Sequence, residues 1–580
     1  MNRHYLKRVL AVMSLVLSFG CAGNSVAPAE TASARNSEAP SAEPSETARP
    51  VSEENTGDII ILYTSDIHCG LKKGFGAVSL AQMRDAMEKQ GNTVLLADNG
   101  DAIQGDSIGT ITKGAAVISV MNALRYDVAI PGNHEFDFGL DEFLKRTQEA
   151  DFPYISCNIT RNDELMFAPY IIREVQGTKI AFIGVTTPLT SFSSSPAHFQ
   201  DENGNTVCHF MWDADGSTLF TAVQNAIDEV KEKGADYVFL MSHLGKDEID
   251  APFNFQTLLE HTEGIDVILD GHTHDMDQLT MNDKSGHPVI RSACGTKLQG
   301  IGWVKISRKD GSLSNGIYTW NNDTEHSEVF GITNEVSGPI QDVYDALSET
   351  MNVKIAESEV TISIYDPVNR DSSGKPVRIC RLQETNMGDF ITDSLRIQTG
   401  ADISFVNASS LRDEIIPGDV TYEDIMRLLP FSNTVCVSEI TGQDLLDALE
   451  WGARNLPKES GFLCPSGFSY EIDATIPSPC TVDTDGHFSS AEGKRRVSNV
   501  LVRGEPVDPD KTYTVASISY LLYEGGGGYT MFDDGKVTKK DITTDSECMI
   551  DYIRKDLGGV IGKEYRDVHG QGRLFVRMPE

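Results

Sequence analysis

Five short polar clusters carry the side chains of this chain that could do chemistry. Each combines Asp, His or Asn with other polar residues, and each follows a run of apolar residues. Side chains of these types bind divalent metal ions, although one such cluster alone more often forms a turn or a structural hydrogen bond. Five of them in one chain favour a shared site. The clusters are TSDIH at 64–68, DNGD at 98–101, GNHEFD at 132–137, SH at 242–243 and DGHTH at 270–274.

The apolar runs before and between these clusters are the elements expected to position them. They are short and rich in β-branched residues, which is typical of buried strands. The runs are 59–63, 93–96, 128–130, 180–185, 237–241 and 267–269, with helix-like stretches at 78–89, 140–150 and 219–233. This alternation predicts an α/β core over roughly 58–280. Because the carboxyl ends of the strands line one crevice in such sheets, the clusters should converge in space.

The number of candidate ligands indicates more than one metal ion. Seven ligands are too many for one tetrahedral ion and suit two ions that share a bridging carboxylate. Imidazole-rich ligation favours Zn, Mn, Fe, Co or Ni over Mg or Ca, which prefer oxygen ligands. The charge of two divalent ions exceeds that of two carboxylates, so the site would attract an anionic phosphoryl group. The candidates are Asp66, His68, Asp101, Asn133, His243, His272 and His274.

Length and charge limit the classes of function. With 580 residues, of which 40 % are hydrophobic, the chain is long enough for two or more globular domains. Its formal net charge of −37 argues against a nucleic-acid polymer as partner, because phosphate backbones require a basic surface. A small anionic substrate remains compatible with this charge, since bound metal ions would supply positive charge locally.

The N-terminus has the features of an export signal. Basic residues precede an apolar run at 9–19 that is too short to span a membrane, so a signal peptide is predicted over 1–21. Cys21 stands where a bacterial lipobox has its lipidated cysteine, although the two residues at 18–19 depart from that motif and plain secretion is the alternative. Residues 22–57 are rich in Ser, Ala, Glu and Pro, which predicts a disordered tether. The enzyme is therefore expected outside the cytoplasm, in contact with the membrane only through a lipid anchor.

Two motifs resemble one known family. GDAIQG at 100–105 and GNHEFD at 132–137 are similar to motifs of the 5′-nucleotidase and UDP-sugar hydrolase family of calcineurin-like metallophosphoesterases. The resemblance implies an α/β fold with an N-terminal metallophosphoesterase αββα sandwich and a C-terminal 5′-nucleotidase-type substrate-binding domain. The expected boundaries are 58–335 for the first domain, 336–358 for a linker helix and 359–580 for the second domain.

The same resemblance implies roles for individual residues of the first domain. Its substrate-side dyad falls on His134 and Asp137, where the imidazole would stabilise charge on the phosphoryl oxygens or assist the leaving group. A plain core histidine at this position is the alternative, which the adjacent ligand Asn133 disfavours. One ion would be held by Asp66, His68, Asp101 and His274, and the other by Asp101, Asn133, His243 and His272.

Three motifs of the second half also resemble the family. They are ETNMG at 384–388, LPFSNT at 429–434 and GGGGY at 525–529. By resemblance, arginines bind the phosphate, two aromatic rings sandwich the base and an amide reads its edge. The chain has Val377 at the family's first arginine position, with an arginine beside it. Without the resemblance, Arg381 and Arg412 would be interpreted as members of surface ion pairs and Phe431 as a core residue. The candidates are Arg378, Arg381, Arg412, Phe431, Asn433 and Tyr520, with Tyr523 as the alternative second ring.

Gly527 is a departure from the family pattern. The family motif GGDGY uses an acidic residue at this position to hold the ribose hydroxyls, and glycine offers no such acceptor. A site without a hydroxyl acceptor has little means to reject a substrate that lacks the hydroxyl. The sequence therefore predicts that deoxyribonucleotides are cleaved nearly as well as ribonucleotides.

The cysteines suggest at most a few disulfides. Ten cysteines are present, with no CxxC pair, and nine remain after Cys21. Cys464 and Cys480 flank a loop-rich stretch, so a disulfide between them is predicted.

The favoured function is hydrolysis of nucleoside 5′-monophosphates to nucleoside and phosphate. The alternatives within the same chemistry are a 2′,3′-cyclic nucleotide phosphodiesterase with 3′-nucleotidase activity and a UDP-sugar pyrophosphatase. A surface nucleotide-binding protein or adhesin that has lost catalysis is the non-enzyme alternative. The complete set of ligand and dyad residues argues against it.

Overall fold

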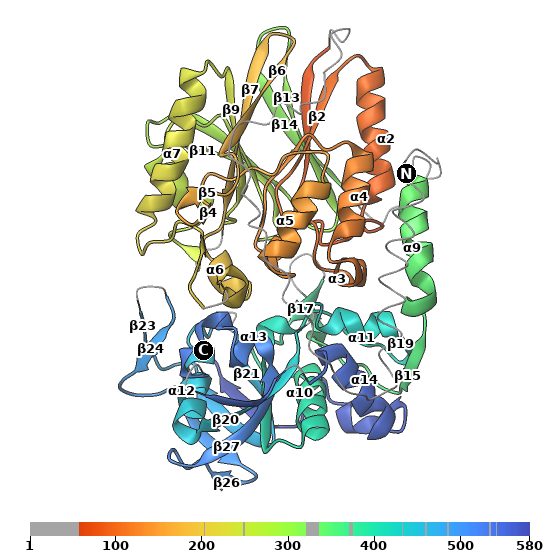
Figure 1. Cartoon of the computed structure of the whole chain (residues 1–580), viewed down its shortest axis with the longest axis vertical. Coiled ribbons are helices and arrows are strands. Elements are labelled where there is room, and N and C mark those ends of the chain that lie inside the picture. The colour runs from red at the N-terminus through yellow and green to blue at the C-terminus, as the bar shows by residue number, and fades with distance from the viewer. Residues whose placement is uncertain are drawn as a thin grey trace, which may run out of the picture.

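The structure is a computed structural model and places two domains one above the other, joined by a helix along one side (Figure 1). It describes residues 57–579 except 202–203, 247–249, 321–335, 371–374, 432, 459–460, 484–485, 533–534 and 541. The predicted signal peptide, Cys21 and the tether, apart from its last residue, lie outside the described residues.

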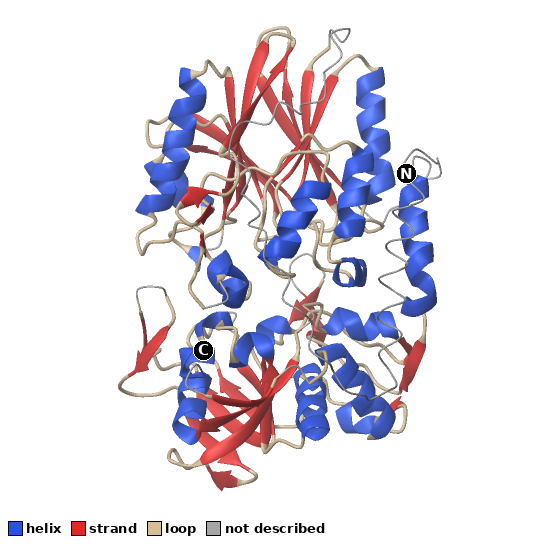
Figure 2. Cartoon of the chain, in the orientation of Figure 1, coloured by secondary structure: helices blue, strands red, loops and turns tan. Residues whose placement is uncertain are grey.

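Two β-sheets stacked face to face form the N-terminal domain, with helices on both outer faces (Figure 2). The first sheet has the order β14 (Leu313–Thr319), β13 (Gly300–Ile306), β1 (Ile59–Thr64), β2 (Thr93–Asp98) and β3 (Val128–Ala129). The second has the order β11 (Met276–Asn282), β12 (Pro288–Cys294), β10 (Val267–Asp270), β9 (Tyr237–His243), β7 (Thr178–Thr186) and β6 (Tyr170–Val175). The outer helices include α2 (Gly76–Lys89), α4 (Ala115–Leu124), α5 (Leu140–Glu149), α7 (Ser217–Glu232) and α8 (Phe255–His261).

The apolar runs form strands because both of their faces are buried. In β1, Ile59 and Ile61 point into the core between the two sheets, whereas Ile60 and Leu62 pack against the helices on the other side. Successive side chains of a strand face opposite ways, so a strand that is covered on both faces is apolar throughout. The predicted αββα sandwich is thereby confirmed.

The parallel strands bring the polar clusters to one end of the sandwich. In the first sheet β1, β2 and β3 are parallel, and in the second sheet β7, β9, β10 and β12 are parallel. The five clusters follow β1, β2, β3 and β10 or end β9, so their side chains meet at the edge that faces the second domain (Figure 1).

A helix and a short three-stranded sheet connect the two halves of the chain. The helix α9 spans Ser337–Met351, and the next strand β15 (Lys354–Ser358) already pairs with β19 (Gly418–Thr421) and β29 (Val560–Ile561). The C-terminal domain thus begins a few residues before the predicted position 359.

The C-terminal domain is an α/β unit with its own continuous core. One sheet has the order β21 (Leu463–Ser466), β18 (Ile403–Asn407), β27 (Thr512–Ile518), β20 (Val435–Thr441) and β28 (Lys536–Lys539). A second has the order β26 (Glu505–Pro506), β25 (Val497–Val502), β22 (Phe468–Asp473) and β30 (Leu574–Arg577). The helix α10 (Asn386–Thr399) packs on β18 and β21, and it begins at Thr385, whose side chain caps it by accepting from the Gly388 N–H.

The predicted disulfide is not formed. Cys464 and Cys480 are both free cysteines. Cys464 lies in the buried edge strand β21 with its Sγ beside Gly388, whereas Cys480 begins a separate hairpin, β23 (Cys480–Val482) with β24 (Phe488–Ala491). The loop-rich stretch between them contains a strand, β22, that holds the two cysteines in different layers.

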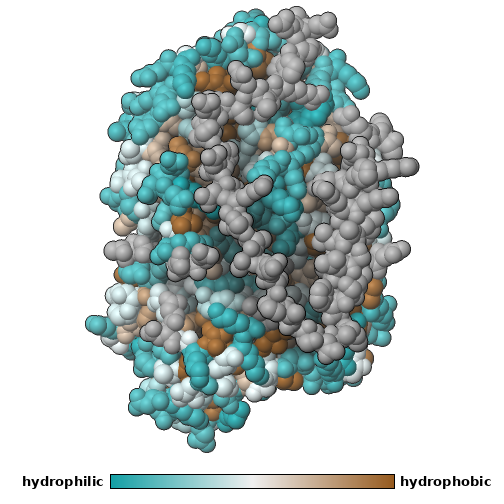
Figure 3. Space-filling view, in the orientation of Figure 1, coloured by the Kyte–Doolittle hydropathy of each residue, from teal (hydrophilic) through white to brown (hydrophobic). Residues whose placement is uncertain are grey.

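The surface is mostly hydrophilic on the face shown in Figure 3, where apolar residues form small separate patches. No helix in the described part of the chain is both long and apolar enough to cross a membrane.

Candidate active site

The candidate ligands lie on backbone that is unusual for their residue types. Asp66, His68, Asp101, His272 and His274 have positive φ angles of 50°, 45°, 57°, 79° and 56°. This left-handed region is disfavoured for residues other than glycine, and it costs roughly 1–3 kcal/mol at each position. Such strain persists only where the surrounding structure imposes it, and it is concentrated at functional sites. Five of the seven candidates share it, so the loops that carry them are built for a defined geometry.

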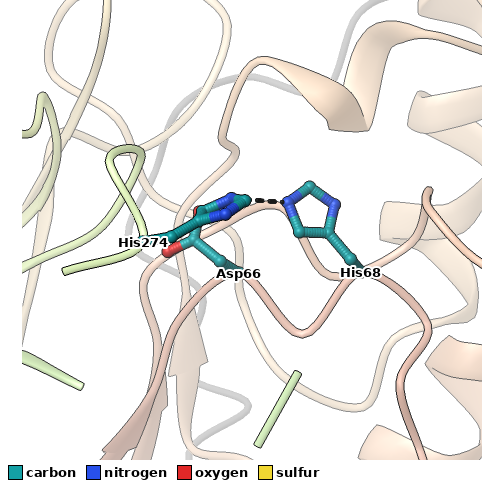
Figure 4. A group of neighbouring side chains, drawn as sticks. All are labelled: Asp66, His68 and His274. Carbon is teal, nitrogen blue, oxygen red and sulfur yellow. Dashed lines mark hydrogen bonds and ion pairs between the residues drawn. The ribbon is translucent and has the colours of Figure 1, made fainter. Parts of the chain in front are cut away.

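One group of candidates converges on Asp66, His68 and His274 (Figure 4). The Nε2 atoms of the two histidines are 3.0 Å apart, and the His274 Nε2 is 3.5 Å from the Asp66 Oδ1. The Asp101 Oδ2 lies 3.8 Å from the His68 Nε2. Two imidazoles and the Asp66 carboxylate therefore hold their ligand atoms close together, with the Asp101 carboxylate beside His68.

A second group surrounds His243. Its Nε2 is 3.2 Å from the Asp101 Oδ2 and 4.0 Å from the Asp66 Oδ1, and it makes no hydrogen bond of ordinary geometry with any described residue. On the same side, the His272 Nδ1 lies 3.0 Å from the Asn133 Oδ1. Asp101 thus lies between His68 of the first group and His243 of the second, as expected of a bridging carboxylate.

Backbone carbonyls set the tautomers of two histidines. The Nδ1 of His68 is 2.9 Å from the Gln104 carbonyl oxygen, and the Nδ1 of His243 is 2.6 Å from the Asn99 carbonyl oxygen. A carbonyl only accepts, so each Nδ1 carries the proton and each Nε2 keeps a lone pair for a metal ion. This arrangement fits a divalent cation better than a purely structural histidine cluster.

The charges of the cluster are strongly coupled. Burial would lower the pKa of His243, but Asp101 and Asp66 outweigh it and raise that pKa to about 10. Burial lowers the pKa of His272 to about 3 and that of His274 to about 4. Burial and Asp101 raise the pKa of Asp66 to about 7 against the opposing effect of His243. A cation at this position would stabilise the carboxylates and the neutral imidazoles together.

Glu135 is a functional residue that the sequence analysis missed. Its carboxylate is fully buried and accepts hydrogen bonds from the backbone N–H groups of Asp101 at 2.8 Å, Ala102 at 2.7 Å and Gly132 at 2.6 Å. It therefore ties the loop that follows β2 to the loop that follows β3, which positions Asp101 and Asn133. Its position inside the motif at 132–137 could have identified it, because an acidic residue among candidate ligands that is not itself a ligand is expected to position them.

Gly132 is required by close packing at the centre of the cluster. A Cβ at this position would lie 2.3 Å from the Asp101 Oδ1 and 2.7 Å from the His243 Nε2. Any other residue would displace one of these ligands.

Not every polar residue of the five clusters contributes to the site. Asp98 is buried and accepts a hydrogen bond from the Thr64 Oγ1 at 2.7 Å. Asp270 accepts from the Ser242 Oγ at 2.9 Å and pairs with the buried Arg291 at 2.8 Å. These carboxylates hold strand ends together.

The predicted dyad is formed beside the cluster. The His134 Nδ1 is 2.6 Å from the Asp137 Oδ2, and the Ser194 Oγ donates to the other Asp137 oxygen at 3.2 Å. Burial opposes protonation of His134, but Asp137 and Asp101 prevail and raise its pKa above the usual value. Since Asp137 holds Nδ1, the Nε2 remains to act on a bound group. The serine was not identified from the sequence.

A pocket of about 730 Å³ lies between the two domains and contains both sets of predicted residues. From the N-terminal domain it is lined by metal-cluster and dyad residues, including Asp101, Asn133, His134, His272 and His274. From the C-terminal domain it is lined by Arg378, Arg381, Arg412, Phe431, Asn433 and Tyr520. All six predicted substrate-binding residues thus face the metal cluster across one cavity.

Arg378 and Arg412 of the pocket form no ion pair with any residue that the structure describes, unlike the surface arginines of the alternative interpretation. The Nε atoms of Arg378 and Arg412 are buried and make no hydrogen bond with any described residue. Burial and the nearby charges of Arg381 and Arg378 lower the pKa of Arg412 to about 9. Three cations crowded in this way favour binding of an anion.

The aromatic residues of the pocket lie beside the reacting centre. The Phe431 ring stacks on the His134 ring at 6.1 Å between centroids, and the Arg412 guanidinium lies 4.9 Å from the Phe431 ring centre. The Tyr520 hydroxyl donates to the Phe192 carbonyl oxygen at 2.9 Å, which fixes its ring at the domain interface. Tyr523 is not among the residues that line the pocket and instead contacts Lys540. The geometry therefore favours Tyr520 as the second ring.

Comparisons with known proteins match both halves of this arrangement. Residues 59–276 match the family described as calcineurin-like phosphoesterase, and residues 354–534 match the 5′-nucleotidase C-terminal domain. The chain belongs to the 5′-nucleotidase family of calcineurin-like metallophosphoesterases. It is a hydrolase of that family, whose calcineurin-like members bind two metal ions.

Similar proteins of this family come from several bacteria. The chain is 27 % identical to Protein UshA of Escherichia coli over 553 residues, which cover 88 % of this chain and 93 % of UshA. It is 25 % identical to the trifunctional nucleotide phosphoesterase protein YfkN of Bacillus subtilis over 570 residues, but covers only 37 % of that longer protein. The crystal structure of a 5′-nucleotidase precursor from Thermus thermophilus has the same fold, with a TM-score of 0.71, 23 % identity, and coverage of 90 % of this chain and 100 % of that one.

Proposed function

We propose that this enzyme hydrolyses nucleoside 5′-monophosphates to nucleoside and phosphate. The observation that carries the proposal is the single pocket in which the Asp/His cluster of one domain faces three arginines and two aromatic rings of the other. Arginines suit a phosphate, and aromatic faces suit a base. The small cavity, together with the net charge of −37, disfavours a polymer.

Two divalent ions would complete the site. We assign one to Asp66, His68, Asp101 and His274, and the other to Asp101, Asn133, His243 and His272. The residues fit this assignment because the Nε2 lone pairs of His68 and His243 point inward and the two carboxylates lie between the histidines. When bound, such ions act as Lewis acids on phosphoryl oxygens and activate water. The imidazole-rich set favours Zn, Mn, Co, Fe or Ni over Mg or Ca.

The chain's own residues then divide the remaining work. Arg378, Arg381 and Arg412 would bind the phosphate oxygens and orient the phosphorus toward the cluster. His134, held by Asp137 through Nδ1, would direct Nε2 at the phosphoryl group or at the leaving oxygen, where it stabilises charge or donates a proton. The side chains of Phe431, Tyr520 and Asn433 would hold the base.

A substrate panel tests this proposal. Hydrolysis would be measured by separating the products (phosphate and nucleoside, nucleoside monophosphate, or UMP and glucose 1-phosphate) from nucleoside 5′-monophosphates, 3′-monophosphates, 2′,3′-cyclic nucleotides and UDP-glucose, with Mn, Zn, Co or Mg returned to metal-stripped enzyme. We expect the highest kcat/KM for 5′-monophosphates and the weakest reactivation by Mg. A preference for cyclic nucleotides or UDP-glucose would replace the 5′-nucleotidase function with one of its alternatives. Nucleotide binding without hydrolysis of any of these substrates would identify a binding protein.

We further propose that the chain is exported and attached to the bacterial cell envelope through a lipid on Cys21. The support is the short apolar run at 9–19 followed by Gly20 and Cys21, together with the polar composition of 22–57. Cys21→Ala should release the enzyme from the membrane fraction with its specific activity unchanged. Recovery of the unaltered chain as a freely secreted protein would contradict lipid attachment.

A further inference from the structure

The carboxylates that line the substrate pocket are of two kinds. Asp101, Asp137 and Asp250 each lie beside a residue of the metal cluster or the dyad: Asp101 beside His243, Asp137 beside His134, and Asp250 at 3.8 Å from His272. Glu524 also lines the pocket but makes no hydrogen bond or ion pair with a cluster or dyad residue among those that the structure describes. It is therefore an acceptor in the pocket without a part in the chemistry assigned so far.

Glu524 is held in place at three points. It lies between the helix α13 (Ser519–Leu522) and the glycine-rich turn η6 (Gly526–Gly528). Its Oε2 accepts a hydrogen bond from the Ser195 Oγ at 2.8 Å, its backbone N–H donates to the Ser519 carbonyl at 3.2 Å, and its backbone oxygen accepts from the Ala197 N–H at 3.3 Å. The other carboxylate oxygen, Oε1, has no hydrogen-bond or ion-pair partner among the described residues. The Glu524 carboxylate is therefore fixed in position, and its Oε1 can accept a hydrogen bond from a ligand.

Two adjacent serines place Glu524 close to the reacting centre. The Ser194 Oγ donates to Asp137 of the dyad, and the next residue, Ser195, donates to Glu524. Consecutive Cα atoms are about 3.8 Å apart, so the two carboxylates are held by neighbouring points of one segment. Tyr520 lines the same pocket as both carboxylates, and burial together with the charges of Asp137 and Glu524 raises its pKa. Glu524 therefore lies beside the aromatic ring and near the phosphoryl site, which is where the sugar of a bound nucleotide would be.

The chemistry of a carboxylate limits what Glu524 can recognise. An ionised carboxylate only accepts hydrogen bonds, and its two oxygens can serve several donors. It repels further anionic groups. The arginines already supply donors for the phosphate, so the partner of Glu524 is a neutral group that donates, such as a sugar hydroxyl.

We propose that Glu524 binds the sugar hydroxyls of the substrate and selects ribonucleotides over deoxyribonucleotides. This proposal rests on the nucleotidase function proposed above. It replaces the expectation drawn from Gly527, which concerned the glycine-rich motif alone. Gly527 is not among the residues that line the pocket, and a Cβ there would point at the Tyr529 ring at 3.1 Å. The acceptor absent from position 527 is supplied three residues earlier.

The test compares sugar selectivity in the metal-loaded full enzyme and in Glu524→Gln and Glu524→Ala. Glu505→Gln, which alters an exposed carboxylate on β26 far from the pocket lining, is the matched control. The specificity constants for AMP, 2′-deoxy-AMP and 2′,3′-dideoxy-AMP would be measured. We expect the wild type and Glu505→Gln to prefer AMP over the dideoxy substrate by roughly 100-fold or more, because a site built for a hydroxyl leaves its acceptor unpaired without it. Both Glu524 variants should reduce this preference to about tenfold or less.

A second measurement separates this proposal from the nucleotidase function. Adenosine and 2′,3′-dideoxyadenosine would be compared as inhibitors of p-nitrophenyl phosphate hydrolysis, which requires metals and dyad but no sugar. Stronger inhibition by adenosine that disappears in Glu524→Ala supports the sugar contact even if AMP is not the natural substrate. Equal specificity constants and equal inhibition for ribo- and deoxy-compounds in the wild type would overturn the proposed sugar contact. A preference for the ribo-compounds that survives in both Glu524 variants would also overturn it. Absence of AMP turnover with intact p-nitrophenyl phosphate turnover would instead refute the proposed function.

Discussion

The two walls of the pocket are built in different ways. On the metal side, five of the seven candidate ligands have left-handed backbone, and the loops are held by buried groups such as Glu135. On the substrate side none of the six predicted residues has a positive φ; in the C-terminal domain the structure describes only Asn499 and Arg503 as non-glycine residues with one. Long side chains from separate elements make up that wall. Metal geometry is thus fixed by the backbone, and substrate selectivity by side chains that can change without refolding the site.

This contrast predicts that changes on the metal side have the larger effects. Asp101→Ala should lower kcat/KM by roughly 10⁴-fold or more, because one side chain would serve both ions. His243→Ala should abolish most turnover as well, with a smaller loss of metal. Activity would be measured together with metal content by mass spectrometry, and circular dichroism would establish that the fold is intact. Full activity of metal-stripped Asp101→Ala would refute the shared-ligand arrangement.

The dyad lies between the two walls, and a change in it can distinguish a loss of catalytic rate from a loss of metal binding. His134→Ala should lower kcat by ~10²- to 10⁴-fold while metal content stays near that of the wild type, since the imidazole stabilises charge or transfers a proton. His209→Ala, an exposed histidine on β8 (Cys208–His209), is the control. If metal content falls together with activity, His134 is a ligand or a structural residue.

Glu135 tests how strongly the loop anchor controls the metal side. In Glu135→Gln one acceptor becomes an NH₂ group that faces the backbone N–H groups of Asp101, Ala102 and Gly132. We expect metal affinity to fall by about 10- to 100-fold, as is usual for groups that orient ligands. Titration calorimetry on stripped protein would measure it. An unchanged affinity would mean that the ligand loops keep their geometry without the anchor.

The smallest effect is expected on the substrate side and depends on pH. The pKa of Arg412 is about 9 because of burial and its arginine neighbours, and a bound phosphate would raise it. Below pH 9 the guanidinium is charged and binds phosphate; above pH 9 the free enzyme loses the proton, so KM should rise by up to about tenfold per pH unit. Arg412→Ala should have a higher KM, and its plot of log KM against pH should show no bend near pH 9. The same bend in the variant would assign the titration to another group.

The sequence predicted the sandwich from its apolar runs, and it named candidate residues on both sides of the pocket that the structure brings together. The strands over 59–63 and 237–241 could be predicted because buried parallel strands are apolar throughout, and the polar loops at their ends gave the seven candidate ligands. Glu135 and Ser194 were missed because their hydrogen bonds produce no recognisable pattern in the sequence. Glu135 binds backbone N–H groups, and Ser194 binds a side chain that is distant along the chain. Glu524 was missed for a related reason, since it enters the pocket only when the two domains meet.

The cysteines show where local reasoning failed. The Cys464–Cys480 disulfide was predicted from proximity in sequence and a loop-rich surrounding. A strand between the two residues separates them, so spacing alone does not predict the pairing.

The most direct test of the account is the metal stoichiometry of activity. Stripped enzyme would be titrated with Mn or Zn while bound metal and AMP hydrolysis are measured on the same samples, for the wild type and for Asp101→Ala. The account predicts that wild-type activity saturates at two ions per chain and that Asp101→Ala neither binds two ions tightly nor recovers activity. Saturation of full activity at one ion per chain, or activity in the stripped wild type, would contradict a two-ion site built on these seven residues.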